Sequence, residues 1–184
     1  MLVCRILYSN ECYVCDYQGK PIEVHGWGDN LKLGQVSAVD VNLDDDPVIF
    51  QRGPVTWDAK SFDRENVLQE KKVIAEDTII TLDADTGKVK SSFGSGLFYM
   101  PHGLSVDHGG NTWVTDVGLH QVMMFSKGAT TPSLGNYILY ISHHSHPSYP
   151  VLGEKFIPGD DANHFCKPTS VAVSSSGQVF VADG

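Results

Sequence analysis

A hairpin-like unit that occurs three times is the feature that most constrains how this chain folds. The three copies are VSAVDVNLDDDPVIFQRG (36–53), PHGLSVDHGGNTWVTDVG (101–118) and PTSVAVSSSGQVFVADG (168–184). Each copy contains a short run of alternating apolar residues, a turn rich in Asp, Asn, Ser or Gly, and a second apolar run. Apolar alternation with a period of two on both sides of a turn is typical of a β-hairpin. The chain is therefore expected to contain repeated pairs of antiparallel strands.

Further strands are predicted between the copies. DTIITLD (77–83) and HQVMMFS (120–126) have the composition of strands, and no ten-residue window has a convincing helical period. Helix is therefore expected to be minor. Repeated antiparallel strands without helices are typical of a β-propeller, in which four-stranded blades surround a central channel. We predict an all-β fold in the form of a partial β-propeller with about three blades.

The spacing of the copies predicts long loops between them. Val39, Leu104 and Val171 occupy equivalent places and are separated by 65 and 67 residues, whereas a propeller blade takes roughly 40–50 residues. Loops are therefore expected at 54–76 and 127–165. Three copies do not close a ring of about 4–8 blades, and the third copy ends where the first two continue. We expect about half a propeller, ending inside a blade.

Composition and charge exclude several classes of protein. With 41% hydrophobic and 19% charged residues, the chain is globular rather than disordered. Its formal net charge of −9 argues against nonspecific nucleic-acid binding, which needs a basic surface. No apolar run approaches the roughly 20 residues that span a bilayer. Neither a nucleic-acid partner nor a membrane segment is therefore expected.

The N-terminal segment and the cysteines give weak signals. Residues 1–15, MLVCRILYSNECYVC, make a poor signal peptide, because an arginine interrupts the apolar run and no clean small-residue cleavage site follows. We expect either a cytosolic protein or a chain without its true N-terminus.

Cys4, Cys12, Cys15 and Cys166 are too sparse for a disulfide scaffold. Cys12 and Cys15 form a C-x-x-C pair with no second pair at zinc-finger spacing, which is weak support for a metal or redox site.

Two residues in the copies are candidates for a functional site. His102 lies at the start of the second copy, where a side chain can point toward a propeller axis, and neutral imidazole is a common zinc ligand. An ordinary loop histidine is the alternative. Arg52 stands in the alignment where the other copies have Asp116 and Asp183, and such a break in a pattern is typical of functional sites. A guanidinium can clamp a carboxylate; the alternative is a surface arginine in an irregular repeat.

Seven blocks of the sequence carry a resemblance to a known family. They are LGQVSAV, VIFQRG, WDAKSFD, EDTIITLD, LFYMPHGLSVD, NTWVTDVGLHQV and NHFCKPTSVAV followed by GQVFVADG. These blocks resemble the lyase domain of the peptidyl-glycine alpha-amidating enzymes, peptidyl-alpha-hydroxyglycine alpha-amidating lyase, which is related to the NHL-repeat propellers. The resemblance assigns residues 31–184 to an incomplete lyase-type propeller domain. Residues 1–30 do not match, and residues 133–150 look like an insertion.

The resemblance implies a fold, a reaction and a set of site residues. It implies a six-bladed propeller with zinc and calcium in its channel, which cleaves a C-terminal alpha-hydroxyglycine to release the peptide amide and glyoxylate. In this pattern His102 is one of three zinc ligands, and Arg52 acts at the active site. Val39 and Leu104 supply backbone oxygens to calcium, which is a hard cation that prefers oxygen ligands. Zinc is expected to act as a Lewis acid and a tyrosinate as the base, with Arg52 lowering the pKa of that tyrosine and holding negative charge.

Other parts of the family pattern lie beyond residue 184. These are the tyrosine, the other two zinc histidines, the calcium carboxylate and the half-cystine that pairs with the one matching Cys166. As written, the chain is expected to be inactive, and it is expected to be poorly stable because an open half-ring exposes sheet edges.

The resemblance also implies partners and a location. The substrates are peptides extended by a C-terminal alpha-hydroxyglycine, and a copper monooxygenase domain often precedes the lyase in such parent chains. The location is the secretory pathway lumen or the cell exterior. Two alternatives remain: a noncatalytic NHL-repeat propeller that binds proteins, and a splice form or misassembled gene product without activity.

The remaining histidines and aromatic residues are expected to be structural. The run His143, His144 and His146 can bind metal incidentally. The histidines expected at strand edges and turns are His108, His120 and His164, and His25 lies in the unmatched region. The aromatic residues expected to pack within blades are Trp57, Trp113 and Phe180.

Overall fold

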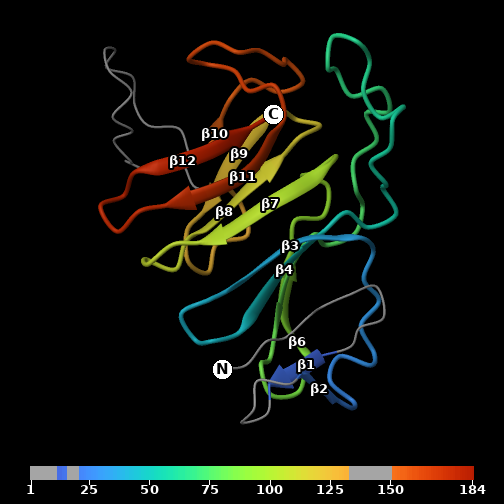
Figure 1. The fold of residues 1–184 in the computed structure, drawn as a ribbon, viewed down its shortest axis with the longest axis vertical. Coiled ribbons are helices and arrows are strands. Elements are labelled where there is room, and N and C mark those ends of the chain that lie inside the picture. The colour runs from blue at the N-terminus through green and yellow to red at the C-terminus, as the bar shows by residue number, and fades with distance from the viewer. Residues whose placement is uncertain (1–11, 16–20, 133–150) are drawn as a thin grey trace.

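All regular structure in the described part of the chain is β-strand. The computed structural model describes residues 12–15, 21–132 and 151–184, and within these residues it contains twelve strands and no helix. The strands form four antiparallel sheets (Figure 1). The all-β prediction is therefore confirmed. The same residues accordingly include no helix long and apolar enough to cross a membrane.

Two of the sheets are four-stranded blades. The first consists of β3 (Val36–Val41), β4 (Pro47–Gln51), β5 (Ile79–Leu82) and β6 (Val89–Phe93), in that order. The second consists of β7 (Pro101–Val106), β8 (Thr112–Asp116), β9 (Gln121–Phe125) and β10 (Val151–Leu152), also in chain order. The strands expected at 77–83 and 120–126 are confirmed as β5 and β9.

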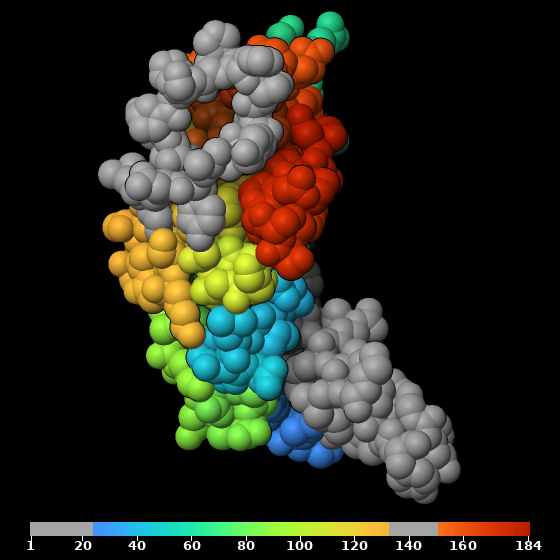
Figure 2. All heavy atoms as spheres, turned by 90° about the vertical axis from the view of Figure 1, so that its left-hand side faces the viewer, coloured from blue at the N-terminus to red at the C-terminus, as the bar shows by residue number. Residues whose placement is uncertain are grey.

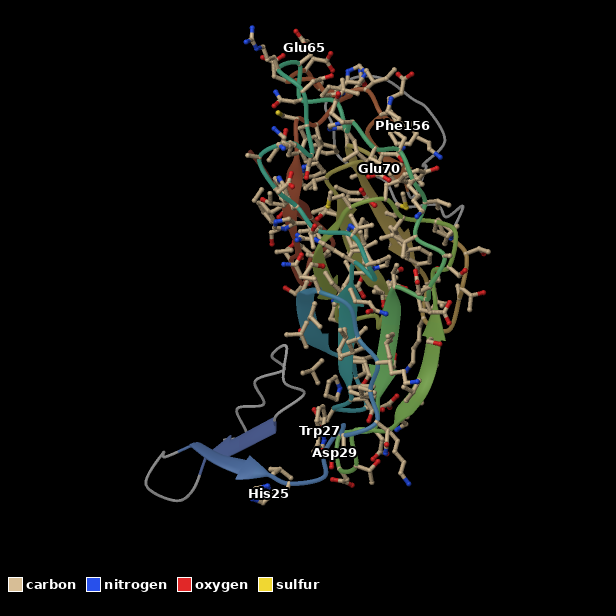
Figure 3. The ribbon with its side chains drawn as sticks, turned by 90° about the vertical axis from the view of Figure 1, so that its right-hand side faces the viewer. His25, Trp27, Asp29, Glu65, Glu70 and Phe156 are labelled. Atoms are coloured by element: carbon tan, nitrogen blue, oxygen red, sulfur yellow. The ribbon has the colours of Figure 1, made fainter. Side chains whose placement is uncertain are left out.

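The other two sheets are hairpins. The strands β11 (Pro168–Val173) and β12 (Val179–Asp183) form the third copy of the repeat, and β1 (Cys12–Cys15) and β2 (Pro21–Val24) form a separate hairpin. Figure 3 shows the β1–β2 hairpin projecting from the end of the first blade, next to His25. The two blades and the third hairpin together make the partial propeller that the sequence predicts.

The three copies of the repeat have the same turn chemistry. The first residue after β3, β7 and β11 is Asn42, Asp107 and Ser174, and its side-chain oxygen accepts a backbone N–H from the residue four positions further on. Side chains of this kind favour turns because they replace a backbone acceptor. In the second copy, Asp107 also accepts from the indole of Trp113 at 2.9 Å. Burial acts to raise the pKa of Asp107, but these hydrogen bonds together lower it below its usual value of 3.8.

The first strands of the copies lie next to one another. Contacts join β3 to β7 and β7 to β11, and Val106 N–H on β7 donates to Asp40 Oδ2 on β3 at 2.7 Å. A Cβ at Gly103 would lie only 2.7 Å from the carbonyl oxygen of Thr169, so β7 and β11 approach closely where the residue is glycine. Figure 2 shows the three hairpins in a row, cyan, yellow-green and red. We call β3, β7 and β11 the inner strands.

The hydrophobic core fills the spaces between the blades. Phe50 and Ile79 of the first blade pack with Val114 and Phe125 of the second, and the rings of Phe50 and Phe98 are 5.0 Å apart. A second cluster joins the second blade to the third hairpin through Trp113, Val122, Met124 and Val171. Each fully buried side chain of this size contributes about 1.5–3 kcal/mol. Trp113 therefore packs as predicted, whereas the prediction that Phe180 packs within a blade is wrong because its side chain is 60% exposed.

Two segments outside the blades pack onto them. Trp27 is buried against Ile49 and Leu82 of the first blade and donates its indole N–H to Ala84 O at 2.8 Å. The expected loop at 54–76 is confirmed; it contains no strand, only an isolated bridge between Phe62 and Leu68. Figure 3 places Glu65 of this loop at the end of the molecule opposite Trp27.

Candidate active site at the inner ends of the blades

The strand register corrects the alignment of Arg52. The pairs across the hairpins are Val36–Gln51, Pro101–Asp116 and Pro168–Asp183. Gln51, not Arg52, therefore stands where the other copies have an aspartate. Gln51 also has the same role: its side-chain oxygen accepts the N–H of Gly34, as Asp116 does from Tyr99 and Asp183 from Cys166. The prediction that Arg52 replaces this aspartate is wrong, because an amide oxygen can act as the acceptor in place of a carboxylate.

Arg52 occupies the next position of the repeat. Its backbone N–H donates to Gln35 O, as Val117 donates to Met100 O and Gly184 to Lys167 O. Val117 in the second copy is a fully buried apolar residue. The arginine therefore takes a position that faces inward, and its side chain is only 7% exposed.

Two hydrogen bonds and an aromatic ring hold the guanidinium of Arg52. Its Nε–H donates to the carbonyl oxygen of Pro101 at 2.7 Å, and its Nη1 donates to Gln35 Oε1 at 2.8 Å. Its Cζ lies 5.7 Å from the ring centroid of Trp57. The surface-arginine alternative is excluded, because a guanidinium held by several contacts at a buried position keeps both its charge and its orientation.

His102 lies at a β-bulge that every copy of the repeat contains. The register of all three hairpins shifts near the start of the inner strand: at Ser37, at Thr169, and between Pro101 and Leu104, where His102 lies. The hydroxyls of Ser37 and Thr169 donate to a carbonyl on the partner strand of their own hairpin, each at 3.1 Å. His102 instead bonds through Nδ1 to Thr169 O in the neighbouring hairpin, at 2.7 Å. A bulge re-aims a side chain, and here it directs an imidazole toward the next inner strand.

The partner of Nδ1 determines the tautomer of His102. A carbonyl oxygen only accepts hydrogen bonds, so Nδ1 carries the proton and the Nε2 lone pair stays available while the ring is neutral. Burial lowers the pKa of His102 below its ordinary 6.5, the bond to Thr169 opposes this shift, and the charge of Arg52 lowers the pKa further. This tautomer, with Nδ1 bonded to a backbone carbonyl, is the one found in metal-binding histidines.

Trp57 brings the two candidate residues together. Its ring meets that of His102 edge-on, with centroids 5.2 Å apart and an interplanar angle of 75°, and the Arg52 guanidinium lies near the same indole. Arg52 follows β4, Trp57 lies in the 54–76 loop and His102 is on β7. Trp57 therefore lies in a loop rather than on a blade strand, although it packs, as predicted, against a buried apolar cluster that includes Met100 and Val117. The WDAKSFD block, five residues after Arg52, was the available signal for this role.

Comparison with known proteins connects this geometry to a family. No family model matches the chain. The chain is 41% identical over 167 residues to peptidyl-alpha-hydroxyglycine alpha-amidating lyase 2 of Drosophila melanogaster, and 43% identical over 159 residues to lyase 1 of that species. It is 46% identical over 160 residues to peptidyl-glycine alpha-amidating monooxygenase B of Xenopus laevis. Over 83–89% of its length, the chain is homologous to proteins named as peptidyl-alpha-hydroxyglycine alpha-amidating lyases.

The chain spans only part of each relative in this lyase family. The matches cover 89%, 84% and 85% of the chain but 37%, 26% and 16% of fly lyase 2, fly lyase 1 and the frog monooxygenase. The activity of the complete lyases is therefore a proposal for this chain.

The metal ligands implied by the lyase family are present here only in part. Among the described residues, no group of three or more His, Cys, Asp or Glu side chains lies close enough to hold a metal ion. His102 fits one position of a zinc site, because its Nδ1 is already bonded and its Nε2 is the remaining ligand atom. Val39 and Leu104 occupy equivalent register positions on adjacent inner strands, paired with Ile49 and Val114. Their predicted role in calcium binding stays a prediction.

The other predicted residues lie apart from the Arg52–His102 pair. His164 bonds to Asp161 through Nδ1 at 2.8 Å, and this bond raises the pKa of His164 above 6.5. His120 lies in the turn between β8 and β9, as predicted, and is fully buried, with Nδ1 bonded to Cys166 O. Cys166 forms no disulfide within the residues that the structure describes. The tract at 143, 144 and 146 lies outside those residues.

A cavity of about 440 Å³ lies beneath the 54–76 loop, beside the site. Its lining combines apolar and charged residues, among them Val55, Leu68, Ile74, Met100, Lys60, Glu70, Lys72 and Glu76. Met100 immediately precedes Pro101, whose carbonyl holds Arg52. The lining includes neither Arg52 nor His102, so Met100 is the link between the cavity and the pair.

Proposed function

We propose that this chain supplies part of the active site of a lyase that converts peptides ending in alpha-hydroxyglycine into the peptide amide and glyoxylate. The observation that carries the proposal is the convergence of buried Arg52 and half-buried His102 on Trp57 at the inner ends of two blades. Homology to fly proteins named as these lyases supports the same reaction. A noncatalytic propeller has no need to bury an oriented guanidinium beside an imidazole with a free Nε2.

Arg52 is suited to the charge of this substrate. Alpha-hydroxyglycine carries a terminal carboxylate, and glyoxylate keeps it. The reaction removes the hydroxyl proton, breaks the bond between nitrogen and the hydroxyl-bearing carbon, and returns a proton to nitrogen, leaving an aldehyde and an amide. A fixed guanidinium at a buried site stabilises the negative charge on the reacting oxygen as the proton leaves.

His102 is the chain's candidate zinc ligand. Zinc, when bound, supplies a Lewis acid that polarises oxygen atoms of the substrate. The hydrogen bond from Nδ1 to Thr169 fixes the direction of Nε2 before the metal binds. We further propose that Val39 and Leu104 give backbone oxygens to a structural calcium, as the lyase resemblance implies.

Additional residues are required for turnover. The described residues supply one histidine at the site and no three-ligand cluster. We therefore propose that the 184-residue chain alone is inactive. The frog relative is named a monooxygenase, which fits a parent protein that also contains a copper monooxygenase domain. The proposed location is the secretory lumen or the cell exterior, where Cys166 can form a disulfide.

A chimera tests the proposed function. Residues 31–184 replace the matching part of fly lyase 2, with which the chain is 41% identical, and glyoxylate release and zinc content are measured. The chimera is expected to bind zinc and to turn over. Arg52→Ala is expected to lower turnover by at least about a hundredfold without loss of zinc.

The control for Arg52 is Arg64→Ala, since Arg64 is an exposed arginine in the neighbouring loop. This variant is expected to keep full turnover. A folded, zinc-bound chimera that releases no glyoxylate would favour the noncatalytic, protein-binding alternative. Near-normal turnover by Arg52→Ala would remove Arg52 from the mechanism.

A further inference from the structure

Two aromatic residues of the 54–76 loop bridge the inner ends of the blades. Trp57 contacts Arg52 and His102, as described above. Phe62 packs edge-on against Trp57, with ring centroids 5.6 Å apart and an interplanar angle of 64°. Phe62 in turn lies 6.3 Å from the ring of His120 and 5.1 Å from Lys167 Nζ. We call residues 57–68 the aromatic strap.

The aromatic strap is anchored at both ends. Lys167, just before β11, donates from Nζ to Asn66 Oδ1. Within the strap, Asp63 accepts the backbone N–H of Val67 at 2.8 Å, and Phe62 forms a bridge with Leu68, whose side chain is buried. The strap therefore connects the third hairpin to the Arg52–His102 pair. Its shape is set by its own hydrogen bonds as well as by these contacts.

We propose that Trp57 is a positioning residue whose indole ring fixes the Arg52 guanidinium relative to the His102 imidazole. The inference deepens the proposed function, on which its catalytic consequence rests. The indole contacts both groups, and the hydrogen bonds from Arg52 to Pro101 O and Gln35 Oε1 do not involve it, so the ring restricts motion without competing for these acceptors. An indole is suited to this role because a large ring ordered by only two torsions covers much area at low entropic cost.

When the Trp57 indole is removed, one side of the Arg52 guanidinium is no longer covered by protein. Water then reaches the bond between Arg52 Nε–H and Pro101 O, which is buried in the intact protein. Buried hydrogen bonds exchange slowly with solvent, and they exchange faster when local opening becomes easier. The exchange rate of this one proton therefore reports on the position of Arg52, whatever the activity of the chain.

The test is hydrogen exchange of Arg52 Nε–H in this chain, followed by NMR. The resonance is assigned by its absence in Arg52→Lys. Trp57→Ala is expected to speed exchange at least about tenfold, whereas Trp57→Phe, which keeps an aromatic ring, is expected to stay near the wild-type rate. The control is Phe156→Ala, which removes a half-buried aromatic ring that packs on Tyr99 at 4.9 Å, and it is expected to leave the rate unchanged.

The outcomes separate positioning from general stability. An unchanged rate in folded Trp57→Ala would overturn the proposal, as would equal acceleration by Phe156→Ala. In the fly chimera, Trp57→Ala is expected to lower kcat about tenfold with little change in KM, and Trp57→Phe to restore it. If exchange responds as expected but the wild-type chimera has no turnover, the proposed function fails and the positioning role stands.

Discussion

Asp116 and Asp183 occupy the same position in two copies of the repeat but differ in burial. Asp116 is 1% exposed and accepts the backbone N–H groups of four residues, Tyr99, Met100, Gly118 and Leu119, at 2.7–3.0 Å. Asp183 is exposed and accepts from Cys166 and Lys167 at 2.8 and 2.7 Å. Burial raises the pKa of Asp116, and the four N–H groups oppose that shift. The hydrogen bonds of Asp116 should therefore contribute more to stability than those of Asp183.

Replacing these two aspartates tests the difference. Asp116→Ala leaves several buried N–H groups without an acceptor, so we expect it to lower the free energy of unfolding by about 3 kcal/mol or more. In Asp183→Ala, the N–H groups of Cys166 and Lys167 can bond to water instead. We therefore expect the free energy of unfolding to fall by only about 1 kcal/mol. Urea unfolding followed by circular dichroism measures both. Equal losses would show that burial does not control the contribution of this aspartate.

His120 gives the fold a dependence on pH. The residue is fully buried with φ of 59°, and its Nε2 has no hydrogen-bond partner among the described residues. Burial lowers its pKa below 6.5; the carbonyl of Cys166 and the charge of Asp183 oppose the shift, and Lys167 and Lys71 add to it. Because the unfolded state binds a proton more readily, the contribution to stability is present above pH 6.5 and is lost as pH falls through the folded-state pKa.

The matching variant is His120→Asn, since asparagine accepts the left-handed backbone of this position and does not titrate. The free energy of unfolding of the wild type is expected to fall between pH 7 and pH 5, and the slope is expected to be smaller in the variant. Identical slopes in the two proteins would exclude His120 as the titrating group.

At the scale of secondary-structure elements, the sequence predicts strands best where alternating apolar residues are flanked by turn-forming side chains. The alternating runs and turn residues of the three copies predict β3–β4, β7–β8 and β11–β12, because one face of each hairpin is buried and Asn42, Asp107 and Ser174 close the turns. The outer strand β6, VKSSF, has no such pattern because four of its five residues are exposed. Strand β10 has only two residues, too few for any periodicity.

The sequence was enough to choose candidate residues for the site, but it did not predict which groups they contact. Arg52 and His102 could be chosen from the sequence, yet the one-residue error in aligning Arg52 arose because Gln51 replaces an aspartate by offering an amide oxygen. The WDAKSFD block marked Trp57 as a candidate, but its contacts could not be predicted, because they depend on how an irregular loop packs against a neighbouring blade. Patterns of two or 3.6 residues carry no information about such a loop.

At the scale of the whole molecule, the proposed site depends on how the blades meet. The inner strands β3, β7 and β11 lie side by side, which brings residues 49 and 67 positions apart into contact across blades. Val39 and Val41 on β3 are about half exposed, at 51% and 48%. The convergence of Arg52, Trp57 and His102 is thus a property of the arrangement of blades rather than of any one hairpin.

The most direct test is a nuclear Overhauser measurement on the chain between Trp57 and His102, whose ring centroids are 5.2 Å apart. We expect cross-peaks between the indole protons and the carbon-bound imidazole protons, together with those between Leu104 and Val114, which pair across β7 and β8. If the strand cross-peaks are present and those between the two rings are absent, Arg52 and His102 do not converge on Trp57, and the proposed active site is wrong.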